Sequence, residues 1–116
     1  MRLIRHVVVL DAADIATESH FWADLLDGRV LDDDPRFHCV IDHDGNWVIG
    51  VQHAPDHTPP DWPDGAPQQI HLDLHVDDAR SAIAEATRLG ARPLLTDDDT
   101  DHHGHHVFAD PAGHPF

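Results

Sequence analysis

The sequence predicts a small α+β protein that contains two copies of one strand–helix–strand–strand–strand unit. Each half starts with a strand-like stretch, continues into an amphipathic helix, and reaches a glycine where that helix should stop. A shift of 63 residues aligns the key positions of the two halves: Asp14 with Asp77, Leu26 with Leu89, Arg29 with Arg92, Leu31 with Leu94 and Asp34 with Asp97. A later shift of 68 residues aligns Asp42 with Asp110 and Gly45 with Gly113. These matches predict an internal duplication.

The clearest strand pattern lies at residues 70–76. Apolar residues alternate there with His71, Asp73 and His75. A period of two predicts a strand with one buried apolar face and one polar face. The acidic pair at residues 77–78 then caps a helix that ends before Gly90.

The first half contains all five elements of the unit. We expect strands at residues 3–10, 29–31, 37–41 and 47–52, and a helix at residues 15–27 that Gly28 ends. An acidic turn at residues 32–35 should stop the second strand. In the second half, strands are expected at residues 92–95 and 106–109, with acidic residues 97–99 breaking the first of them.

A proline-rich stretch at residues 54–67 separates the halves. It holds five of the nine prolines, which excludes regular structure and favours a crossover. We therefore predict a single domain over residues 1–116, with module 1 at about 1–53, the crossover at 54–67 and module 2 at about 68–116. Trp62 in the crossover has two interpretations: a plug on the edge of the core, or a wall over a ligand site.

Composition excludes several classes of function. The formal net charge is -15, with 22 acidic against 7 basic residues, which argues against nucleic acid and anionic membrane surfaces as partners. The sequence also contains 13 histidines. An unperturbed imidazole has a pKa of about 6.5, so many of them would gain a proton in mild acid and offset part of the negative charge. The single cysteine, Cys39, excludes an internal disulfide and is expected to be a buried structural thiol. No signal peptide or membrane-length apolar run is recognisable, so a cytoplasmic protein is expected.

Four stretches together resemble the vicinal oxygen chelate superfamily, on its glyoxalase-like and bleomycin-resistance-like side. They are VVLDAAD…FWADLLDG, PPDWPDG, IHLDLHVDD…AIAEATRLGARPL and the final FADPAGHPF. The resemblance implies two βαβββ modules whose mixed sheet curves around an open cavity. In metal-dependent members, histidine and glutamate side chains hold a divalent ion there, and a short two-module chain commonly forms a homodimer.

The metal ligands that the resemblance implies are mostly missing. The first position falls on Val7, the last strand of module 1 offers only the neutral amide of Gln52, and module 2 offers His71. The glutamate expected after the closing motif would be residue 117, beyond Phe116. A catalytic ion usually takes about three protein ligands, so we expect that the ancestral metal centre is lost. The alternative is a divalent ion (Zn, Ni, Fe or Mn) held by His71 and Gln52.

The polar face of residues 70–76 leaves three interpretations open. His71, Asp73 and His75 are cross-strand hydrogen-bond partners on a cavity wall, contacts to a bound ligand, or a separate metal site. The dense run of aspartates and histidines at residues 97–106 is a solvated loop, an adventitious metal binder or a physiological site.

The favoured function is binding of a small organic molecule in the cavity, with no cofactor. The ligand-contacting residues would be Gln52, Trp62, His71, Asp73 and His75. The alternative is a metal-dependent lyase or isomerase of the glyoxalase type centred on His71, so whether the protein is an enzyme stays open. No nucleophile motif or phosphate loop supports another chemistry.

Overall fold

The computed structural model describes residues 1–95 and 106–116, which form two compact units, Met1–His57 and Thr58–Phe116. The boundary between the units falls inside the proline-rich crossover. Neither helix of the described residues is long and apolar enough to span a membrane. The predicted run of histidines and aspartates lies outside the described residues, except for His106.

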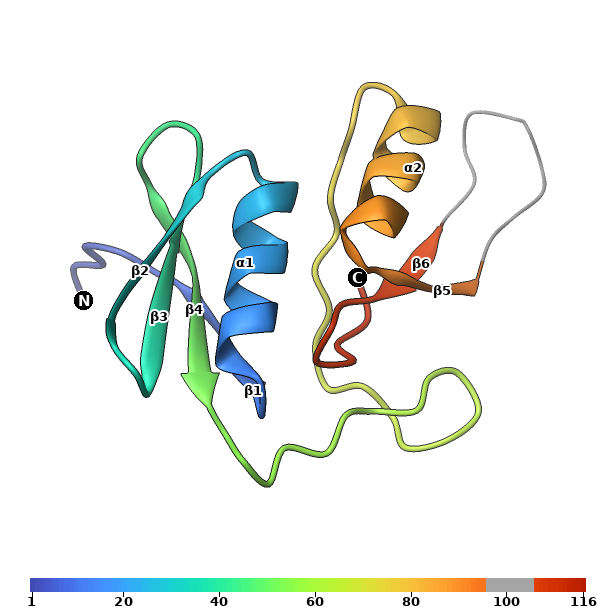
Figure 1. The fold of residues 1–116 in the computed structure, drawn as a ribbon, viewed down its shortest axis with the longest axis horizontal. Coiled ribbons are helices and arrows are strands. Elements are labelled where there is room, and N and C mark those ends of the chain that lie inside the picture. The colour runs from blue at the N-terminus through green and yellow to red at the C-terminus, as the bar shows by residue number, and fades with distance from the viewer. Residues whose placement is uncertain (96–105) are drawn as a thin grey trace. The chain divides into compact units, whose positions relative to one another are not determined.

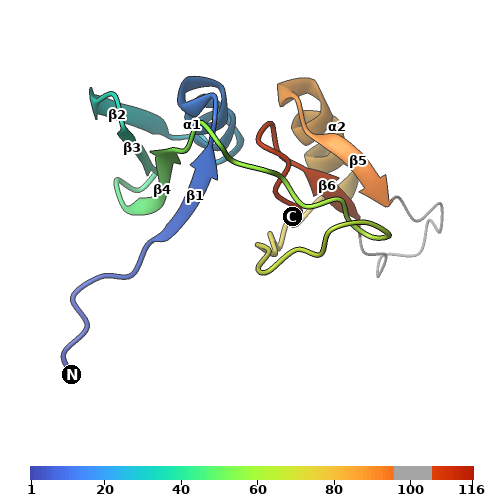
Figure 2. The same ribbon diagram turned by 90° about the horizontal axis from the view of Figure 1, so that it is seen from below.

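The first unit is a four-stranded mixed sheet with one helix (Figures 1 and 2). Its elements are β1 (Val8–Ala12), α1 (Ile15–Leu25), β2 (Arg29–Asp34), β3 (Phe37–Ile41) and β4 (Trp47–His53). The strand order is β1-β4-β3-β2, in which β1 runs parallel to β4 and the other neighbours are antiparallel. The crossover from β1 to its parallel neighbour therefore includes α1, as a βαβ connection requires.

Helix α1 packs on β3 and β4, where the core of this unit lies. Trp22 and Phe21 are 1% and 3% exposed, and their rings meet edge to face at 5.4 Å. Val40 and Val51 on the facing strands are fully buried. The helix starts where Asp14 accepts a hydrogen bond from the Thr17 backbone N–H, as an N-cap does.

The second unit, as described, contains α2 (Ala79–Leu89), β5 (Arg92–Leu95) and β6 (Val107–Ala109). The two strands pair antiparallel, and an isolated bridge joins Ala109 to Pro115. Asp78 caps the start of α2, and Gly90 ends the helix with a φ of 115°, a left-handed conformation that suits glycine.

Several predicted boundaries differ from the structure. The first strand begins at Val8 rather than at residue 3, and α1 ends at Leu25 rather than at residue 27. The predicted acidic turn at residues 32–35 is wrong, because Asp34 still belongs to β2 and the turn follows it. There the Asp34 carboxylate accepts the backbone N–H of Arg36 at 2.9 Å, so its position is fixed by the turn beside it.

The prediction of a strand at residues 70–76 is also wrong for this structure. The chain there carries no strand assignment, and Figure 1 draws it as a yellow coil leading to α2. Strand assignment needs a ladder, and none of the described strands pairs with this stretch. The expected apolar face is also mostly exposed, since Ile70, Leu74 and Val76 are 65%, 42% and 52% exposed and Leu72 is half-buried. In the second half, the described residues therefore show only a helix and two strands of the expected unit.

Candidate functional site

His71 and Asp73 are the predicted site residues that the structure brings together. The His71 Nε2 atom lies 3.4 Å from Asp73 Oδ1, and the side chains are 51% and 75% exposed. The two residues are only two positions apart, so the contact is local in the sequence. His75 lies two residues further on and is also exposed. This part of the second unit therefore presents an accessible imidazole with a carboxylate beside it.

The other two predicted site residues lie elsewhere in the chain. Gln52 is exposed near the end of β4, where its backbone is in register with Asp11 of β1 and Phe37 of β3. Trp62 is half-buried within the crossover part of the second unit. For Gln52, a ligand contact and a metal ligand both stay possible interpretations. For Trp62, so do a plug on the edge of the core and a wall over a ligand site. The roles of both residues stay predictions.

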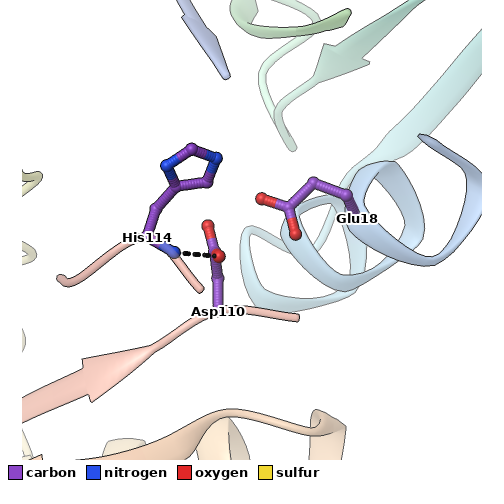
Figure 3. Close-up of side chains that lie close together, drawn as sticks. All are labelled: Glu18, Asp110 and His114. Carbon is purple, nitrogen blue, oxygen red and sulfur yellow. Dashed lines mark hydrogen bonds between the residues drawn. The ribbon is translucent and has the colours of Figure 1, made fainter. Parts of the chain in front are cut away.

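A turn near the C-terminal end holds a buried carboxylate. The sequence predicted the turn but not the burial. Asp110 is 3% exposed, and its Oδ1 accepts the backbone N–H of His114 at 2.8 Å (Figure 3). Its backbone N–H donates to the His114 carbonyl at 3.0 Å, and its own carbonyl accepts from Gly113 at 2.9 Å. A ring nitrogen of His114 also lies within 4.8 Å of an Asp110 carboxylate oxygen. In the sequence, the aspartate that starts the DPAGH motif was the feature that indicated this turn.

Helix α1 carries two buried polar residues that sequence reasoning also missed. Glu18, drawn in Figure 3, is fully buried and its Oε1 accepts the indole N–H of Trp22 at 3.0 Å. Ser19 is fully buried too, and its hydroxyl lies 2.8 Å from Nδ1 of His38 on β3. The glutamate lies in the first turn, where a helix favours negative charge. The i,i+4 spacing of Glu18 and Trp22 was a readable signal, but the long-range Ser19–His38 pair had none.

Local hydrogen bonds and burial shift the pKa values of several side chains. The backbone N–H of Thr17, and then its hydroxyl, lower the pKa of Asp14, and the Ser81 hydroxyl and backbone N–H do the same to the pKa of Asp78. Burial raises the pKa of the Cys39 thiol, which keeps it protonated and weakly nucleophilic at neutral pH. Cys39 is half-buried rather than fully buried as expected.

Comparison with known families supports the resemblance seen in the motifs. The model of the family described as glyoxalase-like domain matches residues 7–116, which is nearly the whole chain. A comparison with curated protein sequences found no match.

Solved structures match the fold across the full chain. A hypothetical protein, SA1046 from S. aureus, has 12% identity and a TM-score of 0.68, with 100% of this chain and 92% of that chain covered. The fosfomycin resistance protein FosX from Listeria monocytogenes has 13% identity and a TM-score of 0.68, with coverage of 100% and 88%. FosX from Mesorhizobium loti has 15% identity and a TM-score of 0.66, with coverage of 100% and 89%. These matches confirm the predicted α+β fold of the glyoxalase and bleomycin-resistance type.

The donor atoms of this chain do not fit a resident divalent ion at the positions that the superfamily implies. Val7 is a half-buried aliphatic residue, Gln52 supplies a neutral amide, and only His71 is a strong ligand. Within the described part of the second unit, no third histidine, cysteine or carboxylate joins His71 and Asp73. A variant of Listeria FosX, a neighbour of the same fold, was solved with Mn(II) and 1S,2S-dihydroxypropylphosphonic acid.

Proposed function

This chain belongs to the glyoxalase-like domain family, and we propose from this membership that it binds a small organic molecule without a resident metal ion. The observation that carries the proposal is the exposed His71–Asp73 pair, in which ring nitrogen and carboxylate lie 3.4 Å apart. A carboxylate beside an imidazole fixes the orientation of the ring and leaves the other ring nitrogen available to a ligand.

The other residues predicted from the sequence to contact the ligand add further groups. In the second unit, His75 adds an exposed imidazole and Trp62 a half-buried ring, and Gln52 in the first unit, an exposed amide, stays a prediction from the sequence. Aromatic surface together with a few polar groups is the usual composition of a small-molecule site. Imidazole and amide groups donate and accept hydrogen bonds, so an oxygen-rich ligand suits this set.

A metal-dependent lyase or isomerase is the second candidate. One observation favours it: a carboxylate partner on a histidine is the usual support of a metal-binding imidazole. The small number of donors weighs against it, as described above.

The test combines metal analysis with ligand binding on tag-free protein. After exhaustive dialysis against a mild chelator, the metal content is measured and the protein is titrated with small 1,2-diols, hydroxy acids and phosphonates. Binding is followed through the ring signals of His71 and Trp62 in NMR spectra. We expect folded, metal-free protein and saturable shifts with at least one compound class.

The matched variants are His71→Ala and His43→Ala. His43 is also an exposed imidazole 3.4 Å from a carboxylate, that of Asp27, but it lies in the first unit, outside the proposed site. We expect His71→Ala to lose ligand binding and His43→Ala to keep it. About one tightly held ion per chain that disappears only in His71→Ala would overturn the metal-free proposal in favour of the metalloenzyme. Absence of saturable binding to every compound class would overturn it as well.

A further inference from the structure

The chain contains three Asp–Gly pairs, and the structure places them in different surroundings. They are Asp27–Gly28 directly after α1, Asp44–Gly45 in the turn between β3 and β4, and Asp64–Gly65 in the crossover. In such a pair, the backbone nitrogen of the glycine can attack the side-chain carboxyl carbon of the aspartate, because glycine carries no β-carbon that would hinder the approach. The surroundings of each pair therefore decide whether it reacts.

Packing and short hydrogen bonds hold two of the three pairs. The Gly28 N–H donates to the Ala23 carbonyl at 2.8 Å, and a β-carbon on Gly28 would overlap the carbonyl oxygen of Ile41. The Gly65 N–H donates to the Asp61 carbonyl at 2.6 Å, and a β-carbon on Gly65 would overlap the Asp61 side chain. A backbone nitrogen that attacks a side chain must leave its hydrogen bond while its peptide plane turns. Close packing opposes that turn in both pairs.

The Asp44–Gly45 pair has room to react. Both residues are exposed in the turn that joins β3 to β4 (Figure 1). A β-carbon on Gly45 would meet no other atom within 4 Å, and the Gly45 N–H donates to the Asp42 carbonyl at 3.0 Å, the longest of the three glycine hydrogen bonds. Among the described residues, none forms a hydrogen bond or an ion pair with the Asp44 carboxylate. This carboxylate can therefore rotate towards the backbone that follows it.

The base of the same turn is held firmly. The Asp42 N–H donates to the Asn46 carbonyl at 2.8 Å, and the Asn46 N–H donates to Oδ1 of Asp42 at 2.8 Å. The Asn46 side-chain amide donates to the other carboxylate oxygen of Asp42 at 3.3 Å. These bonds fix the Asp42 side chain in place, as an Asx-type turn does. Within this turn, the free carboxylate and the accessible glycine therefore meet only at residues 44 and 45.

We propose that Asp44 is a site of spontaneous covalent modification, at which the Gly45 nitrogen closes a succinimide ring on the Asp44 side chain and water reopens it as isoaspartate. In the first step the bond between this nitrogen and Cγ forms, the nitrogen loses its proton, and a carboxyl oxygen leaves as water. In the second step water adds to one ring carbonyl and the bond from that carbonyl to nitrogen breaks. Opening at Cγ restores aspartate, and opening at the α-carbonyl gives isoaspartate. The water released is taken up again, and the reaction is independent of the proposed ligand binding.

The modification changes the backbone of the turn. Isoaspartate moves the side-chain methylene into the main chain, so the path from residue 44 to residue 45 becomes one carbon longer. The hydrogen bond from Gly45 to the Asp42 carbonyl then loses its geometry. Strands β3 and β4, which this turn joins, are the two inner strands of the four-stranded sheet. Isoaspartate at residue 44 therefore acts on the centre of the first unit.

Peptide mapping of aged protein tests the site directly. The tag-free chain is incubated at neutral pH and digested, and electron-transfer dissociation distinguishes isoaspartate from aspartate at residues 27, 44 and 64. We expect isoaspartate at residue 44 to form about tenfold faster than at the other two, which corresponds to about 1.4 kcal/mol of activation free energy. Chain aged in urea is the matched control, because the three pairs lose their surroundings there and should react at similar rates. Absence of isoaspartate at residue 44 in folded protein, or the same ratio between the sites with and without urea, would overturn the proposal.

Two glutamate variants confirm where the reaction occurs. Asp44→Glu would need a larger ring, so we expect the total isoaspartate of the aged chain to fall about tenfold. Asp27→Glu is the matched variant at another exposed Asp–Gly pair and should leave the total unchanged. Circular dichroism checks that both variants keep the parent fold, which the exposure of the two side chains favours. A total in Asp44→Glu that equals that of the parent chain would place the reaction elsewhere and contradict the proposal.

Discussion

Strand β1 and residues 71–77, called here the 71–77 segment, hold corresponding places in the two halves of the chain, yet among the described residues only β1 pairs in a ladder. The difference does not come from the side chains, since the alternation of polar and apolar residues is more regular in the 71–77 segment. It comes from the neighbour: β4 lies between β3 and β1 and bonds to both. A strand is therefore made by its partner as much as by its own pattern.

The two helices differ in the same direction. Helix α1 buries five residues, including Phe21 and Trp22, whereas α2 buries only Ala86. Because the free energy from burial grows with the apolar area removed from water, α1 contributes more to stability than α2. The first unit should therefore supply most of the stability of the chain, and the following changes test that difference.

Truncation of the aromatic core should have the largest effect. Trp22 is 1% exposed and donates its indole N–H to Glu18, so Trp22→Ala should cost about 3–5 kcal/mol of unfolding free energy. Ile83→Ala on the half-buried face of α2 should cost less than about 2 kcal/mol. Urea unfolding followed by far-UV circular dichroism measures both. Equal losses would show that the two halves contribute equally.

The buried Ser19–His38 pair should give the next largest effect. Ser19→Ala leaves Nδ1 of the buried His38 ring without its serine partner, and we expect a loss of about 1–3 kcal/mol. The other serine of the chain, Ser81, is exposed at the start of α2 and provides the control. Ser81→Ala should cost less in the same urea experiment. A larger loss for Ser81→Ala would contradict the assignment of this stability to the buried pair.

Local signals predicted the elements that local chemistry determines. The cap at Asp14, a cap within the pair 77–78 and the stop at Gly90 were readable, because each depends on residues a few positions away. The repeat alignment had matched Asp14 with Asp77, whereas the structure caps the second helix with Asp78. The start of β1 was missed by five residues, since its length is set by pairing with β4 rather than by the apolar run before Val8.

For the candidate site, the sequence placed His71 and Asp73 on one face of a predicted strand, and the structure has their side chains 3.4 Å apart although it assigns no strand there. It could not find Ser19 with His38, which are 19 residues apart and meet only through the packing of α1 on β3. The burial of Asp110 was hidden for the same reason, since a turn motif does not reveal what covers it.

The contribution of the capping carboxylates to stability should depend on pH in the same way in the two halves. Hydrogen bonds from Thr17 and Ser81 lower the pKa of Asp14 and Asp78, so the native state holds both carboxylates charged more strongly than the unfolded state does. This stabilisation is complete above the unfolded pKa, near 3.8, and is lost as the pH falls through the lower native pKa values.

Urea unfolding of Asp14→Asn and Asp78→Asn between pH 2 and 7 tests this expectation. Asparagine keeps the cap but removes the charge, so each variant should be less stable than the parent chain at pH 7 and should converge with it in acid. Asp44→Asn, an exposed loop change, serves as the control. A difference that persists unchanged to the lowest pH would mean that the carboxylate charge plays no part in the cap.

The ends of the two helices should give the smallest effect, with opposite signs. Helix α2 ends in a left-handed glycine, Gly90, whereas after α1 the left-handed position is held by Asp27 at a φ of 50°. Gly90→Ala should therefore cost about 1 kcal/mol, and Asp27→Gly should stabilise the chain by a few tenths of a kcal/mol, although it removes the weak exposed contact with His43. His43→Ala measures the loss of that contact alone, so the gain at Asp27 can be corrected for it. If Asp27→Gly remained destabilising after this correction, the left-handed backbone at residue 27 would cost nothing, and the end of α1 would be as well adapted as that of α2.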